Sequence, residues 1–166
     1  CLRNGDLIMR SHLENFEKHL AEFVGVKYAI GLNSGTDALF FSLKAAGIRP
    51  GDEVITVSHT FVATISSVVY CDAKPILIDI GKDMEMNTDL IDSAITRSTK
   101  AIVPVHLNGR MCKMDRLLDI AEDKDLAVIE DAAQALGAKY RGQNAGSGGL
   151  TGCFSFYPAK ILGSAG

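Results

Sequence analysis

The sequence predicts an α/β protein with three layers (αβα), in which helices cover both faces of a mostly parallel sheet. Helical and strand patterns alternate along the 166 residues. The strand-like segments are short apolar runs rather than alternating ones, which is typical of strands that are covered on both faces. Apolar residues make up 47% of the chain and charged residues 22%, the balance of an ordinary globular protein.

The first predicted element is an amphipathic helix over Ser11–Val24, in which apolar residues recur at helical spacing. Ser11 is a candidate N-cap because Glu14 follows three residues later, as in a capping box. Gly25 is expected to end the helix, since glycine readily adopts the left-handed conformation found at helix C-termini.

Strand and helix patterns then alternate. The predicted strands are residues 28–32, 54–57, 76–80, 101–105, 126–129 and 153–156. The predicted helices are residues 35–46, 61–71, 89–95 and a segment marked by Met114, Leu117, Leu118 and Ala121. The glycine-rich stretch 142–152 has no GK[ST] ending and is expected to be a flexible or tight loop rather than a phosphate loop. Ligands of such sheets bind at the carboxyl ends of the strands.

Composition excludes several classes of function. The chain carries 17 basic and 20 acidic side chains, a formal net charge of −3, so it has no basic footprint for nucleic acid. Its longest mostly apolar stretch, residues 60–71, is too short to span a membrane. The cysteines and histidines show no metal-binding spacing, so no metal site is expected. Isolated thiols and the lack of a secretory signal lead us to expect a cytoplasmic protein.

A first candidate site is the segment 33–37, between a predicted strand and a predicted helix. Free backbone N–H groups and the positive end of the helix dipole favour an anion there. Gly35 would let the anion approach the backbone, and Ser34 and Thr36 add hydroxyl donors. The alternative is an ordinary N-cap, in which a hydroxyl group serves the helix itself.

A second candidate is Asp131, in the segment 130–134 at the carboxyl end of an apolar strand. A buried acid is costly unless it has a partner, and a protonated ring nitrogen is a good one. The alternative is that Asp131 caps the turn that follows.

A third candidate is Lys160, which follows the apolar, aromatic segment 154–157. Partial desolvation would lower its pKa and free the amine as a nucleophile. The alternative is a solvated surface lysine. Ser155, five residues earlier, could donate to an anion, and Phe61 could lie flat on a ring-shaped ligand, with core packing as its alternative. His106, beside a strand end, could contact a substrate or simply pack in the core.

Together these candidates match what pyridoxal 5'-phosphate (PLP) requires of a protein. A lysine forms a Schiff base with the cofactor, and an acid keeps the pyridine nitrogen protonated so that the ring can accept electrons. A helix N-terminus can hold the phosphate.

Six segments, in this order along the chain, carry a resemblance to a known family: LENFEKHLAEFVG (13–25), SGTDAL (34–39), PGDEVITV (50–57), TFVAT (60–64), EDAAQA (130–135) and FSFYPAK (154–160). In these segments the chain resembles the DegT/DnrJ/EryC1/StrS family of PLP-dependent sugar aminotransferases, within the fold-type I (aspartate aminotransferase-like) superfamily. The resemblance runs from about Ser11 to Gly166. It departs at Asn108, where the family often has tyrosine, and at residues 111–113. The resemblance places these positions near the substrate, so they bear on which substrate is bound and not on the use of the cofactor.

The resemblance implies a role for each candidate residue. Lys160 would form the Schiff base and shuttle protons, and Asp131 would pair with the pyridine nitrogen. Two residues would contact the ring, Gln134 near its hydroxyl and Phe61 by stacking. Three residues would hold the phosphate, namely Gly35, Thr36 and Ser155.

The resemblance also implies a PLP-dependent transaminase that moves an amino group from glutamate to a nucleotide-linked keto-sugar, in amino-sugar, polysaccharide or antibiotic sugar biosynthesis. A homodimer with shared active sites is expected, without nucleic acid or membrane partners. The alternatives are a PLP-dependent sugar dehydratase of the same family and a non-catalytic regulatory relative. Dehydratase relatives carry histidine in place of the lysine, so Lys160 favours transamination.

Family members are much longer than this chain, which begins with Cys1 rather than methionine. Residues 1–166 would therefore be the N-terminal part of an incomplete PLP-binding large domain. The rest of that domain and a small C-terminal domain would be missing, and we expect this piece alone to be inactive.

Overall fold

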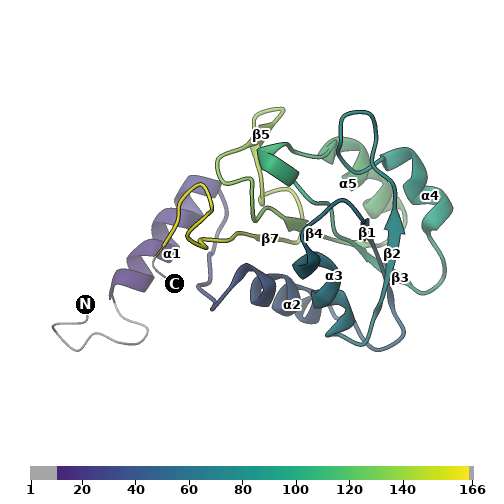
Figure 1. Ribbon diagram of the computed structural model, residues 1–166, viewed down its shortest axis with the longest axis horizontal. Helices are drawn as coiled ribbons and strands as arrows, with labels where there is room; N and C mark the ends of the chain where they lie inside the picture. The colour runs from purple at the N-terminus through teal and green to yellow at the C-terminus, as the bar shows by residue number, and fades with distance from the viewer. Residues whose placement is uncertain (1–10, 165–166) are drawn as a thin grey trace.

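The computed structural model describes residues 11–164, which form a parallel five-stranded sheet with helices on both faces (Figure 1). The strands lie in the order β2-β1-β3-β4-β7. They are β1 (Glu53–Val57), β2 (Lys74–Ile78), β3 (Thr99–Ile102), β4 (Ala127–Asp131) and β7 (Thr151–Cys153). The helices are α1 (Ser11–Val24), α2 (Gly35–Ala45), α3 (Val62–Val69), α4 (Ile91–Ala94) and α5 (Met114–Asp123), with short 3-10 turns η2 (Thr88–Leu90) and η3 (Leu107–Gly109). The α/β prediction is confirmed.

Two separate cores form the layers of this fold. Helices α2 and α3 pack on one face of the sheet, where Leu39 and Val68 meet Ile129. Helices α4 and α5 cover the other face, where Ile91 and Leu117 belong to the second core. Successive residues of a strand point to opposite faces, so each central strand is apolar on both sides, as its continuous apolar sequence predicted.

The order of the strands places a switch point at the centre of the sheet. The chain leaves β1 through α3 to reach β2 on one side, and then crosses to β3 on the other side of β1. Parallel sheets bind their ligands at the carboxyl ends of the strands around such a point. Three of the candidate residues lie at this edge: Phe61 and Ser155 in loops and Asp131 as the last residue of β4.

Helix α1 stands apart from the sheet and contacts the C-terminal segment, drawn in yellow in Figure 1. The Phe16 and Phe156 rings meet edge to face with centroids 4.9 Å apart. The helix ends where predicted, because Gly25 takes the left-handed conformation (φ 85°) and the amides of Gly25 and Val26 both donate to the Ala21 carbonyl.

The predicted strand over 28–32 is wrong. Tyr28 and Ile30 are 72% and 78% exposed, and the segment pairs with no strand in the described part of the chain. The Gly31 amide instead donates to Glu17 Oε1 of α1 at 2.6 Å. The apolar run that suggested a strand therefore carries surface side chains of an extended linker.

Two further predictions are corrected near the C-terminal end. The predicted loop 142–152 contains half of a small antiparallel hairpin, formed by β5 (Lys139–Tyr140) and β6 (Gln143–Asn144). The last strand, β7, begins before the predicted 153–156 because its pairing with β4 starts at Thr151. Residues 154–156 have already left the sheet. The other predicted elements are present with bounds shifted by a few residues.

Candidate active site

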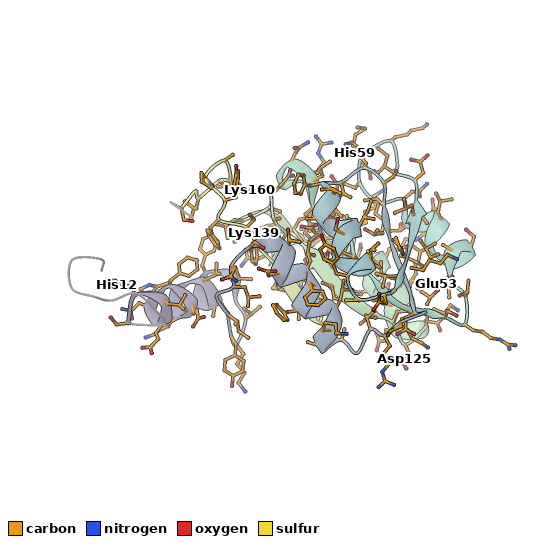
Figure 2. The ribbon with its side chains drawn as sticks, turned by 60° about the horizontal axis from the view of Figure 1, so that its bottom comes forward. His12, Glu53, His59, Asp125, Lys139 and Lys160 are labelled. Carbon is orange, nitrogen blue, oxygen red and sulfur yellow. The ribbon has the colours of Figure 1, made fainter. Side chains whose placement is uncertain are left out.

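The candidate residues gather where β4 and β7 end and where α2 and α3 begin. In Figure 2, Lys160 lies on the side of the molecule that carries α1, whereas Glu53 and Asp125, at the amino ends of strands, lie on the opposite side. A surface cavity of about 690 Å³ is lined by Asp52, Lys100 and Leu126, at those amino ends. It is therefore separate from the candidate site.

Asp131 is the last residue of β4 and is only 5% exposed. Its Oδ2 accepts a hydrogen bond of 2.6 Å from Thr64 Oγ1, on α3. Its Oδ1 accepts from the Ala133 amide at 3.2 Å, so the side chain does cap the following turn, as the simpler interpretation held. Burial raises the pKa of Asp131, although the bonds from Thr64 and Ala133 and the charge of Lys160 oppose this effect. The carboxyl group is thus a buried acid poised to gain from a cationic partner.

The N-terminus of α2 contacts the segment that follows β7. Ser34 is the N-cap, and its Oγ accepts from the Asp37 amide at 3.1 Å, as the N-cap alternative predicted. Because an α-helix leaves its first N–H groups without intrahelical partners, the amides of Gly35 and Thr36 remain as donors for a ligand. A Cβ atom at Gly35 would lie 3.1 Å from the Ser155 Cβ, so only glycine fits easily beside that serine.

Lys160 lies in a turn beyond β7 and is half-buried, between the two alternatives set by the sequence. Its amide donates to the Tyr157 carbonyl at 2.8 Å, and Ser164 folds back to the Phe156 carbonyl. Burial raises the pKa of Asp131, and the charge of Lys160 is the last of the influences that lower it, after the hydrogen bonds from Thr64 and Ala133 and the charge of His106. The lysine and the buried acid therefore share one electrostatic environment.

The two predicted ring contacts differ in their surroundings. Phe61 is the N-cap residue of α3 and is 64% exposed, so its core-packing alternative is wrong. Gln134 Oε1 accepts from the Asn108 amide at 3.0 Å, in the turn η3 where Asn108 adopts a left-handed conformation (φ 55°). Gln134 thus links the turn after β4 to the loop after β3.

The comparison with known families decides which group of proteins this architecture represents. The model of the DegT/DnrJ/EryC1/StrS aminotransferase family matches residues 1–166. The chain belongs to this family.

Individual members of the family are similar along most of this chain. The GDP-perosamine synthase of Caulobacter vibrioides is 49% identical over 148 residues, which cover 89% of this chain and 40% of that protein. A pleiotropic regulatory protein of Geobacillus stearothermophilus is 42% identical over 167 residues, covering 99% of this chain and 45% of that protein. The crystal structure of DesV from S. venezuelae, in complex with a ketimine intermediate, superposes with a TM-score of 0.96 at 42% identity. It covers 99% of this chain, which spans 45% of the DesV chain.

The structure adds two groups that the sequence interpretation missed. Thr64 is the hydrogen-bond partner of Asp131 and is itself bonded to Thr60 Oγ1 at 2.7 Å. Thr60 precedes α3 and Thr64 lies in its first turn, so the hydroxyl pair forms only where the chain enters the helix. Glu130 was passed over in favour of its neighbour, yet it is 0% exposed and carries a dense set of hydrogen bonds.

The structure also places His106 and three of the four cysteines. His106 packs in the core, fully buried and 2.8 Å from Glu130, and so does not face a substrate. Cys71, Cys112 and Cys153 are free, buried thiols, while Cys1 lies outside the described residues. Between residues 11 and 164, no cluster of side chains could hold a metal ion, and no helix has the length and apolar character needed to cross a membrane.

Proposed function

We propose that the full-length protein is a PLP-dependent aminotransferase that transfers an amino group to a nucleotide-linked keto-sugar. One observation carries the proposal: the buried acid Asp131 ends β4 opposite Cys153 of β7, two residues before the serine that contacts the N-terminus of α2. Membership of the aminotransferase family supports the same chemistry.

The residues present fit the cofactor. The close approach of Gly35 to Ser155 forms a cradle in which the α2 amides and the serine hydroxyl could hold a phosphate. Thr36 would add its hydroxyl on the same turn. Exposed Phe61, beside the Thr60–Thr64 pair, is free to lie against an aromatic ring, and Gln134 stands in the turn after Asp131.

Bound PLP would supply an electron sink for the substrate carbon that exchanges its amino group. The Asp131 carboxylate would hold a proton on the ring nitrogen, and Thr64 would fix the carboxylate in the orientation that does so. The Lys160 amine would first hold the cofactor and then, once displaced, carry a proton to and from the substrate. The half-buried position of Lys160 limits competition from water.

The sugar substrate is proposed from the relatives. Relatives named for GDP-, dTDP- and UDP-linked amino-sugars favour a nucleotide-linked keto-sugar as amino acceptor, and we propose glutamate as the donor. We further propose a homodimer with shared active sites, in which residues 1–166 are the N-terminal part of the PLP-binding large domain. Buried, free thiols favour a reducing cytoplasmic location.

The full-length protein tests the proposal. It is expected to bind PLP, to change the cofactor's absorbance when glutamate is added, and to regain it when a nucleotide-linked keto-sugar follows. Mass spectrometry should find the amino-sugar and 2-oxoglutarate. Lys160→Ala should abolish the lysine-linked absorbance and lower the rate by about 100-fold or more, while Lys139→Ala, on exposed β5, serves as the control.

Each alternative function has its own outcome in this experiment. A deoxygenated sugar without amine transfer would establish a dehydratase and overturn the transaminase proposal. Failure of the full-length protein to bind PLP would overturn the enzyme proposal and favour a regulatory role, such as the one named for the Geobacillus relative.

A further inference from the structure

The last two residues of β4 are both acids, and they point to opposite faces of the sheet. Asp131 meets Thr64 on the face covered by α3, whereas Glu130 faces His106 and the glycine-rich segment 146–149. The proposed function uses Asp131 and gives Glu130 no role. Yet a carboxylate that is 0% exposed must be strongly compensated to remain in a core.

The hydrogen bonds of Glu130 saturate its carboxylate. Oε1 accepts from the amides of Gly148 and Gly149 at 2.7 and 2.8 Å. Oε2 accepts from the Gly146 amide and pairs with His106 Nε2, both at 2.8 Å. Burial alone would raise the pKa of Glu130, but the bonds from His106 and from the Gly149 and Gly146 amides outweigh it and lower the pKa. Glu130 is therefore a buried anion.

The imidazole of His106 is fixed in one tautomer. The Cys112 amide donates to Nδ1 at 3.3 Å, which requires Nδ1 to be the acceptor. The proton then sits on Nε2 and is donated to Glu130. The carboxylate of Glu130 therefore accepts four hydrogen bonds, one from the His106 ring and three from backbone amides.

The segment bound by Glu130 leads directly into the site. It runs into β7, and Ser155 and Lys160 follow within a few residues. Contacts along this path are very close: a Cβ at Gly152 would clash with the Gly146 backbone, and one at Gly149 would lie 2.6 Å from the Val128 carbonyl oxygen. A shift of the segment 146–149 would therefore be passed on to β7.

We propose that Glu130 is a positioning residue, whose carboxylate holds the segment 146–149 against β4. The position of β7, and therefore of Ser155 and Lys160 relative to Asp131, depends on this contact. This inference rests on the proposed role of Lys160. The two adjacent acids at the end of β4 thus serve both faces of the sheet: Asp131 acts toward the cofactor, and Glu130 holds the backbone that brings Lys160 to it.

Glu130→Gln in the full-length protein is the sharpest variant, because it preserves the volume. Whichever way the amide is turned, its NH₂ group faces two donors, either Gly148 and Gly149 or Gly146 and His106. Hydrogen exchange of peptides covering 146–157 should speed up, in the cofactor-free protein as well as the loaded one. The pH midpoint of the cofactor's absorbance should shift, and kcat should fall about 100-fold, the effect of a 1 Å misplacement, with little change in KM.

Glu122→Gln, an exposed carboxylate on α5, is the matched control and should behave as the wild type in all of these measurements. If Glu130→Gln loses thermal stability while its kcat, absorbance titration and exchange over 151–157 stay at wild-type values, Glu130 is a structural residue only. If Glu130→Gln does not fold, Glu130→Asp decides by the same readouts, since its shorter side chain cannot keep all the contacts. If the wild-type protein does not bind the cofactor, the proposed function is overturned. Hydrogen exchange of peptides covering 146–157 in the cofactor-free protein would still test the role of Glu130.

Discussion

Thr64 Oγ1 donates a hydrogen bond of 2.6 Å to Asp131 Oδ2. This bond joins α3, the helix capped by the exposed Phe61, to the buried acid at the end of β4. Oδ2 can only accept when the acid is ionised, so the hydroxyl must donate. Thr60 completes a short chain of hydroxyl groups toward the start of α3. The start of α3 and the end of β4 are thereby held together by side chains as well as by packing.

Replacing Thr64 tests this link. Thr64→Val keeps the shape and removes the donor, so the pKa of Asp131 should rise further and its charged form should be less available. A hydrogen bond to a charged group contributes about 1.5–3 kcal/mol, so kcat/KM of the full-length enzyme should fall about 10- to 100-fold. Thr64→Ser keeps the hydroxyl and should stay close to wild type. Equal losses in both variants would show that packing, not the hydrogen bond, matters here.

Asp131→Asn should separate cofactor binding from catalysis. The amide keeps the size of the side chain and can still accept from Thr64, but it carries no charge to hold a proton on a ring nitrogen. Cofactor affinity measured by equilibrium titration should change little, while the rate of the half-reaction with glutamate should fall about 100-fold or more. Full activity of Asp131→Asn would remove this residue from its proposed role.

Gly35→Ala should weaken the anion cradle. The added Cβ would lie 3.1 Å from the Ser155 Cβ, so the start of α2 and the segment after β7 must move apart. The dissociation constant for PLP should rise about tenfold, the equivalent of one lost hydrogen bond, and inorganic phosphate should compete less well. Lys44→Gln, at the exposed far end of α2, removes a positive charge without touching the cradle and should leave both affinities unchanged. Equal effects of the two variants would indicate general charge attraction.

The pH dependence of stability should reveal Glu85. This residue is buried beside Cys112 Sγ, and burial raises its pKa from 4.5 to about 7. Between these two values the native protein keeps a proton that the unfolded chain has lost, so stability falls as pH rises from 4.5 to about 7. Glu85→Gln cannot ionise, so its melting temperature relative to wild type should rise between pH 4.5 and pH 8. A constant difference across that range would contradict the assignment.

Much of the fold could be predicted because each central strand is apolar on both faces. The same reasoning failed at Tyr28 and Ile30, where a short apolar run is exposed in a linker that pairs with no strand in the described part of the chain. Local pattern describes which side chains tend to be covered, but it does not reveal whether a neighbouring strand is present to pair with the backbone. The hairpin β5–β6 was missed for a related reason, since each strand has only two residues.

Asp131 stood out in the sequence because an acid at the end of an apolar strand demands a partner. Its true neighbours, Thr64 and Glu130, did not stand out. Threonine is ordinary in a helix, and the glycine-rich segment that surrounds Glu130 resembles any flexible loop. Only the three-dimensional structure shows that backbone amides from that segment converge on one carboxylate.

The pair Glu130–Asp131 has a consequence for how β4 can be redesigned. A slip of one residue in a strand turns every side chain to the opposite face, and here it would exchange the two acids. Asp131 would then face the amides of the segment 146–149, and Glu130 would face Thr64. Because the two side chains differ in length, neither carboxylate would lie at hydrogen-bonding distance from its new partners. The two adjacent acids differ in length and in partners, so together they fix the register of β4. Engineers who insert or delete residues upstream of β4 should find the strand returning to its present alignment or failing to fold.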